Sequence, residues 1–285
     1  MPIESVYKEV YMDPFTDYGF KRLFGEEDSK EYLIDFLNSV FVGFIPHIHE
    51  LNYHKNEHLG NKHIDRNAVF DLYCKSKDGS RFIIELQKTK QDYFKQRSLF
   101  YSTFAITEQA KKGRWDFNLS PVYCIGLLNF SLDDNHKKYL TKAKILDIDT
   151  HQTVIEELNF AFIEAPKFNK TLHANSSKQD KWLYVLTHLA QLSDMPEELS
   201  EKLFEDFFQK ASVLKLSTRE RARYNASITY YRDMHNIEQQ RLREGEEIGV
   251  AKGKTEVARA MKLKGLDPAM IAELTGLNIA DIAAL

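Results

Sequence analysis

Val69-Phe70-Asp71-Leu72-Tyr73-Cys74 and Phe82-Ile83-Ile84-Glu85-Leu86-Gln87-Lys88 are two apolar stretches separated by seven residues. Their β-branched and aromatic residues predict two neighbouring strands. Each stretch carries one acid, Asp71 or Glu85, where a strand should be apolar. A buried carboxylate is costly unless a metal ion or a positive charge compensates it. The two acids therefore indicate a metal site.

The turn between the stretches sets the register of the predicted hairpin. A three-residue Lys77-Asp78-Gly79 turn, with Gly79 in the left-handed conformation, is a common closure. It places Asp71 opposite Glu85, with side chains about 5 Å apart. Gln87 shares a face with Glu85 because strand side chains alternate. Two carboxylates this close repel each other unless a divalent cation lies between them. A slip of one residue would separate them.

These residues also carry a family resemblance. Asp71 followed by Glu85-Leu86-Gln87 resembles the PD-(D/E)XK nuclease signature, with glutamine where lysine is usual. Further segments are similar to the PD-(D/E)XK nuclease family transposases, also called the recombination-promoting nuclease (Rpn) group, over about residues 10 to 250: Met12–Gly25, Phe94–Ser98, Gln109–Asp116, Pro166–Lys170 and Asp180–Leu183.

The resemblance implies a fold, a reaction and a set of site residues. The fold would be α/β, a restriction-endonuclease-like mixed sheet flanked by helices with a C-terminal helical region. The reaction would be metal-dependent hydrolysis of DNA, linked to recombination or mobile elements. Asp71, Glu85 and the Leu86 carbonyl would bind Mg²⁺ or Mn²⁺, since hard ions prefer oxygen ligands. Gln87 could position a water but carries no charge. Asp17 is a candidate extra acid, or else a first-turn acid favoured by the helix dipole.

Two other functions stay open. The chain could be a catalytically weak or inactive nuclease fold that works as a nucleic-acid-binding or assembly module, forming homo-oligomers through its C-terminal helices. An RNA nuclease is a third reading, because the site chemistry does not distinguish DNA from RNA.

Charge is distributed unevenly along the chain. Its 285 residues are 43% hydrophobic and 28% charged, with a net charge of −3. Between Lys88 and Arg114, however, seven residues are basic and two are acidic. This patch favours contacts with a phosphate backbone, although an ordinary solvated helix face would look the same. The residues expected to contact DNA, with little sequence preference, are Lys88, Lys90, Lys95 and Arg97.

Several classes of protein are excluded or disfavoured. No run of eighteen apolar residues predicts a membrane span, and the first residues do not resemble a signal peptide, so we expect a cytoplasmic protein. Cys74 and Cys124 lie in apolar stretches and are expected to be buried thiols, with a disulfide the minor alternative. Residues 249–255 have the wrong glycine spacing for a phosphate-binding loop.

The first 176 residues are predicted to form the nuclease-like core. Asp13-Pro14 predicts the start of a helix that ends at Gly25, and Ser29 precedes a second amphipathic helix. A helix over 91–112 and a buried central strand over 121–130 should follow. Further strands are expected over 143–149, 152–158 and 160–164. Five of the ten histidines fall between His47 and His63; they could form a metal cluster, but a partly exposed strand and loop fits better.

The remainder is predicted to be helical. Residues 177–243 would be a helical subdomain with helices over 178–192, 196–212 and 218–243. Residues 244–285 would be a tether punctuated by glycines every four residues, followed by a small helical tail. Glycine at that spacing costs about 1 kcal/mol per residue in a helix, so a loose tether is favoured over a closely packed helix pair.

Overall fold

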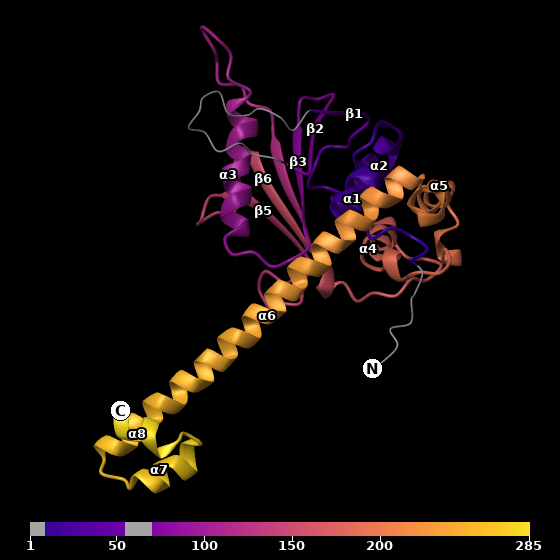
Figure 1. Cartoon of the computed structure of the whole chain (residues 1–285). Helices are drawn as coiled ribbons and strands as arrows, with labels where there is room; N and C mark the ends of the chain where they lie inside the picture. Colours follow the sequence, from indigo (N-terminus) through magenta and orange to yellow (C-terminus); the bar gives the residue numbers. More distant parts are fainter. Residues whose placement is uncertain (1–8, 55–69) are drawn as a thin grey trace. The chain divides into compact units, whose positions relative to one another are not determined.

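The computed structural model describes residues 9–54 and 70–285 (Figure 1). The chain divides into two compact units, Met1–Ile228 and Thr229–Leu285. The first unit contains the sheet and the helices that cover it. None of the helices in the described ranges is both long enough and apolar enough to cross a membrane.

The sheet of the first unit has six strands in the order β1-β2-β3-β4-β6-β5. The pairs β3–β4 and β4–β6 are parallel, and the other neighbours are antiparallel. This is the mixed sheet that the family resemblance implies. The strands are β1 (Leu51–Tyr53), β2 (Leu72–Ser76), β3 (Arg81–Gln87), β4 (Val122–Leu128), β5 (Leu140–Leu146) and β6 (Thr153–Glu164).

The hairpin between β2 and β3 has the predicted register. The Ser76 N–H donates to the Ser80 carbonyl over 2.9 Å, and Leu72 pairs with Ile84. Gly79 closes the turn with φ +95°, a backbone conformation that glycine adopts without strain. Continued by one residue, this register places Asp71 opposite Glu85.

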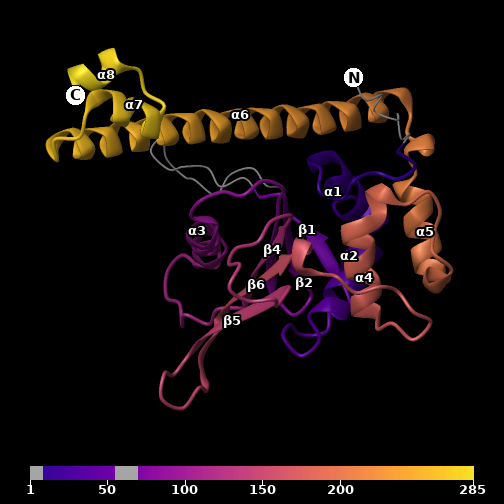
Figure 2. The same ribbon diagram turned by 90° about the horizontal axis from the view of Figure 1, so that it is seen from below.

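Helices cover both faces of the sheet (Figures 1 and 2). One face bears α3 (Phe94–Thr107), which connects β3 to the parallel strand β4. The other face bears α1 (Asp17–Phe24), α2 (Lys30–Val40), α4 (Lys178–His188) and α5 (Lys202–Ala211). Every residue of β4 is buried, which confirms the predicted central strand. Parallel strands covered on both sides are apolar throughout for this reason.

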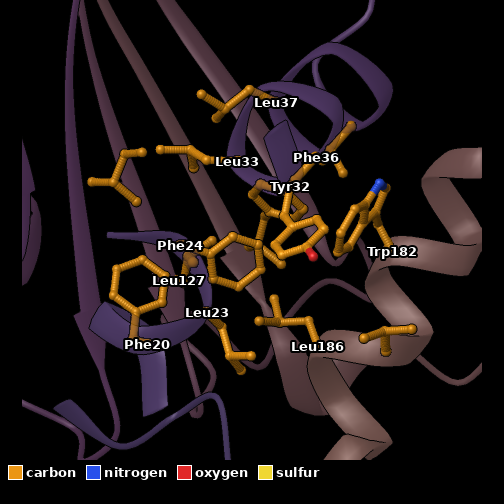
Figure 3. Packing of buried hydrophobic residues seen from close by; sticks show 14 of the residues in the cluster. Phe20, Leu23, Phe24, Tyr32, Leu33, Phe36, Leu37, Leu127, Trp182 and Leu186 are labelled. Carbon is orange, nitrogen blue, oxygen red and sulfur yellow. The ribbon is translucent and has the colours of Figure 1, made fainter. Parts of the chain in front are cut away.

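Aromatic and leucine side chains pack together in the main core (Figure 3). Trp182 of α4 is fully buried, and its ring centroid lies 6.0 Å from that of Phe24, 5.9 Å from Phe36 and 5.2 Å from Phe207. The indole N–H donates to an Asp35 carboxylate oxygen over 2.6 Å, so the polar atom of this side chain is satisfied. Four helices are thereby joined to one another over the sheet.

Several predicted element bounds are wrong. The strand expected over 143–149 is β5, Leu140–Leu146, and the helices expected over 178–192 and 196–212 are the shorter α4 and α5. The first helix begins at Asp17 rather than at Asp13-Pro14, because the Thr16 hydroxyl accepts from Gly19 N–H and caps it there. α3 is shorter than the predicted 91–112, since Tyr93 before it is left-handed with φ 64°. The strands expected over 152–158 and 160–164 are one continuous strand, β6.

The glycine-punctuated stretch is helical, so the tether prediction is wrong. It belongs to α6 (Thr218–Leu263), a helix of 46 residues. A Cβ atom built at Gly245, Gly249 or Gly253 would have no described atom within 4 Å, so close helix packing does not explain these glycines. The neighbouring Glu, Arg, Lys and Ala residues are strong helix formers, which offsets the cost of three glycines.

The tail of the second unit is helical, as the sequence predicts. Helices α7 (Pro268–Thr275) and α8 (Ile279–Ala284) are capped by the side chains of Asp267 and Asn278. Gly276 ends α7 in the left-handed conformation with φ 71°. A small cluster of buried residues holds this unit together: Ala258, Ile271 and Ile282.

Candidate active site

The C-terminal half of β3 projects polar side chains toward the α3 side of the sheet. Ile84 and Leu86 belong to the main core on the opposite face, whereas Ile83 packs in the cluster that includes Ala105 of α3. Because strand side chains alternate, Glu85 and Gln87 share the face of Ile83.

Asp71 and Glu85 meet at this point, as the register requires. Asp71 N–H donates to Glu85 Oε1 over 3.3 Å. In return, Asp71 Oδ2 accepts from Leu86 N–H over 2.7 Å. The Glu85 carboxylate therefore contacts the backbone of Asp71, and the Asp71 carboxylate contacts the backbone of Leu86, the residue after Glu85. The structure brings the two expected carboxylate ligands together, with the Leu86 N–H beside them. The Leu86 carbonyl stays a predicted ligand.

The environment disfavours two negative charges here. Only 8% of Glu85 is exposed. Burial, and after it the charge of Asp71, raise the pKa of Glu85 to about 8. Burial also raises the pKa of Asp71, although the bond from Leu86 N–H acts in the opposite direction. A proton or a cation is needed to stabilise this pair.

Asp17 and Lys21 of α1 contribute charge near the two acids. They form an ion pair over 2.6 Å, and about half of each side chain is exposed. The Lys21 charge favours ionisation of Asp71 and Glu85, whereas the Asp17 charge opposes ionisation of Asp71. No pattern in the sequence singles out Lys21. Whether Asp17 is an extra catalytic acid stays a prediction, since its place in the first turn of α1 also suits the helix dipole.

The four candidate DNA-contacting residues lie in three different surroundings. Arg97 lies at the site, where one of its terminal nitrogens, Nη2, donates to Gln87 Oε1 over 2.6 Å. Lys88 follows the end of β3 and pairs with Asp13 over 2.6 Å. Lys90 and Lys95 are exposed. The contact between Arg97 and Gln87 has no signal in the sequence, because it depends on how α3 crosses the sheet.

A glycine on β4 controls how closely α3 approaches the site. Gly126 is the partner of Glu85 in the parallel register. A Cβ atom at this position would lie 2.8 Å from Cε1 of Phe94, so the missing side chain leaves room for the Phe94 ring against the sheet. The ring in turn lies 5.1 Å from the Arg97 guanidinium. Gly126 and Phe94 are thus positioning residues that sequence reasoning missed.

The donor set fits a hard divalent ion. Carboxylate and carbonyl oxygens are the ligands that Mg²⁺ and Mn²⁺ prefer, and a cation would relieve the repulsion between Asp71 and Glu85. Within residues 9–54 and 70–285 there is no cluster of three or more His, Cys, Asp or Glu side chains suited to a metal, and the Leu86 carbonyl stays the predicted third ligand.

Three histidines of the histidine-rich segment, His47, His49 and His54, lie within the described residues. The rings of His47 and His49 are 4.7 Å apart, and His54 packs near Tyr73. His58 and His63 lie outside the described residues. The described histidines show no metal cluster.

Comparison with known proteins gives one match. A family model described as PD-(D/E)XK nuclease family transposase matches residues 14–240, which include the sheet, the acid pair and α3. No curated protein and no solved structure matches the chain.

Proposed function

Because the chain belongs to the PD-(D/E)XK nuclease family transposases, we propose that it is a divalent-metal-dependent endonuclease that hydrolyses phosphodiester bonds in DNA. The observation that carries this proposal is the pair formed by the half-buried Asp71 and the buried Glu85, which lie opposite each other in the β2–β3 register. A nuclease fold without a metal would gain nothing from two repelling carboxylates in its sheet.

Each site residue has a role in this proposal. The carboxylates of Asp71 and Glu85 and the carbonyl of Leu86 would hold Mg²⁺ or Mn²⁺. When bound, such an ion lowers the pKa of a water ligand and neutralises charge on the scissile phosphate. Gln87 would act as a positioning residue of the site, because its amide accepts from Arg97 and donates to the Thr89 carbonyl. Asp17 would add negative charge at the rim of the site.

The substrate is inferred from the family and from the surface. Lys90 and Lys95 are exposed near the start of α3, where they would contact phosphates on either side of the scissile bond. Such contacts position a duplex without reading its sequence. We therefore propose DNA, bound with little sequence preference, and a role in recombination or mobile-element movement.

A second candidate function has some support in the C-terminal unit. Met270, Leu274 and Ile279 on α7 and α8 are each more than half exposed, and exposed apolar side chains in one small unit favour a protein contact. In this alternative, the nuclease fold is inactive and the chain binds nucleic acid or assembles with a second copy.

A calorimetric titration of the full chain with Mn²⁺ and Mg²⁺ separates the two. The nuclease requires binding that is lost in both Asp71→Asn and Glu85→Gln. Glu50→Gln, which removes an exposed carboxylate from the same unit, is the matched control and should bind like the wild type. A folded wild-type chain that binds neither ion would overturn the nuclease proposal and favour the binding module.

A further inference from the structure

Gln87 stands where the motif usually has lysine, and its side chain is bound by a cation from another element. Gln87 Oε1 accepts from Arg97 over 2.6 Å, while Gln87 Nε2 donates to the Thr89 carbonyl over 3.2 Å. Both ends of the amide are thus occupied. A positive charge is placed directly beside the motif position that lacks one.

The Arg97 guanidinium is held in a fixed position. It lies 5.1 Å from the ring centroid of Phe94 and 5.9 Å from that of Tyr101, which precede and follow it by about one turn of α3. A further bond runs to Gln91. The Nε atom is buried and finds no partner among the described residues. Two aromatic faces and two hydrogen bonds therefore fix the side chain before any substrate arrives.

No carboxylate of the described residues 9–54 and 70–285 contacts Arg97. Lys88 pairs with Asp13 and Lys21 pairs with Asp17, whereas Arg97 forms no ion pair within the part of the chain that the structure describes. Its field still reaches the acids, because the guanidinium attracts the carboxylates of both Asp71 and Glu85. Among the described residues, Arg97 is therefore a cation at this site that remains able to act on an anionic ligand.

We propose that Arg97 takes the part of the motif lysine, stabilising the negative charge that develops on the scissile phosphate. The inference rests on the proposed nuclease function. Water adds to phosphorus and loses a proton to solvent, while the bond from phosphorus to the leaving oxygen breaks and that oxygen gains a proton from solvent. Arg97 stays protonated throughout, because a guanidinium is not a base at neutral pH. It contributes charge and hydrogen bonds, and Gln87 orients it.

Cleavage kinetics test the role in the reaction. Arg97→Gln should lower the cleavage rate at saturating DNA by about 100-fold or more, as expected when a charged donor to a transition state is removed. DNA affinity measured with Ca²⁺ should change by less than about threefold, because the contact strengthens only as charge develops. The double variant Arg97→Gln with Gln87→Lys, which returns the charge to the motif position, should recover at least about tenfold of the loss.

Metal affinity gives a second readout that does not need activity. In the absence of DNA, Arg97→Gln should bind Mn²⁺ several-fold more tightly, because a positive charge beside the metal ligands is removed. The double variant should return this affinity to that of the wild type. Lys77→Gln, which removes an exposed charge from the far end of the hairpin, is the matched control and should leave Mn²⁺ affinity unchanged.

The outcomes are distinguishable. Cleavage by Arg97→Gln within threefold of the wild type would overturn the inference, as would a loss confined to DNA affinity, which would make Arg97 a simple phosphate contact. Weaker Mn²⁺ binding would overturn it too, since that result means a structural role. A wild-type chain that binds Mn²⁺ but does not cleave DNA would refute the nuclease function. In that case, an Mn²⁺ affinity unchanged in Arg97→Gln would also refute the claim that the Arg97 charge lies beside the metal ligands.

Discussion

Replacing Glu85 by glutamine should stabilise the metal-free protein at alkaline pH. The pKa of Glu85 rises from 4.5 to about 8 on folding, so between these values the folded chain holds a proton that the unfolded chain has lost. The free energy of unfolding therefore falls as pH rises through this interval, and the folded protein is most stable at the low-pH end of it. The shift corresponds to a loss of up to about 4 kcal/mol at pH 8. The glutamine side chain introduced by Glu85→Gln would not titrate and could still accept from Asp71 N–H.

The assay is a series of thermal melts in EDTA between pH 5 and pH 8.5. At pH 5 the two proteins should melt at similar temperatures. At pH 8 Glu85→Gln should melt higher by roughly 10 °C, at about 2–4 °C per kcal/mol for a unit of this size. Glu50→Gln, the exposed control, should follow the wild type at every pH. Parallel melting curves for wild type and Glu85→Gln across the whole range would refute the buried, protonated state of Glu85.

Three further changes have defined outcomes. In thermal melts at pH 8, saturating Mg²⁺ should raise the melting temperature of the wild type and leave that of Asp71→Asn unchanged; an equal rise in both would contradict the ligand assignment. Gly126→Ala should cost about 1–3 kcal/mol in urea unfolding, because its Cβ would displace the Phe94 ring; no change would mean that the ring has other room. Tyr224→Phe should cost about 1 kcal/mol in urea unfolding, because the bond from Asp13 N–H to the phenol oxygen is lost; unaltered stability would contradict this.

The hairpin was predictable because its information is local. The turn at Lys77-Asp78-Gly79 fixes the pairing, and the pairing alone brings Asp71 to Glu85. Period-two alternation then places Gln87 beside them. No knowledge of the rest of the chain is needed for this part of the site.

The positions of the cations were not predictable in the same way. Lys88 is adjacent to the motif in sequence, yet it pairs with Asp13 of the segment before α1. Arg97 is ten residues from Gln87 and reaches it because α3 packs back on the sheet over Gly126. These contacts depend on tertiary packing, which leaves no periodic trace in the sequence.

The glycines of α6 show a different limit. Their spacing predicts a break in the helix when each glycine is considered alone. Helix propensity is a weak predictor at single positions, however, and becomes informative only when it is summed over a long stretch. Between Arg243 and Leu263, the strong helix formers outnumber the three glycines. The sum, rather than the single positions, decides the conformation.

Nicking of supercoiled plasmid tests the central claim, that Asp71 and Glu85 form the metal centre of a nuclease, most directly. The full chain would be incubated with Mg²⁺ or Mn²⁺ beside Asp71→Ala and Glu85→Ala, with folding of each variant verified by circular dichroism. The account predicts nicked and linear products with the wild type, and none with either variant or in EDTA. No cleavage by the folded wild type, or cleavage that persists in both variants, would contradict it.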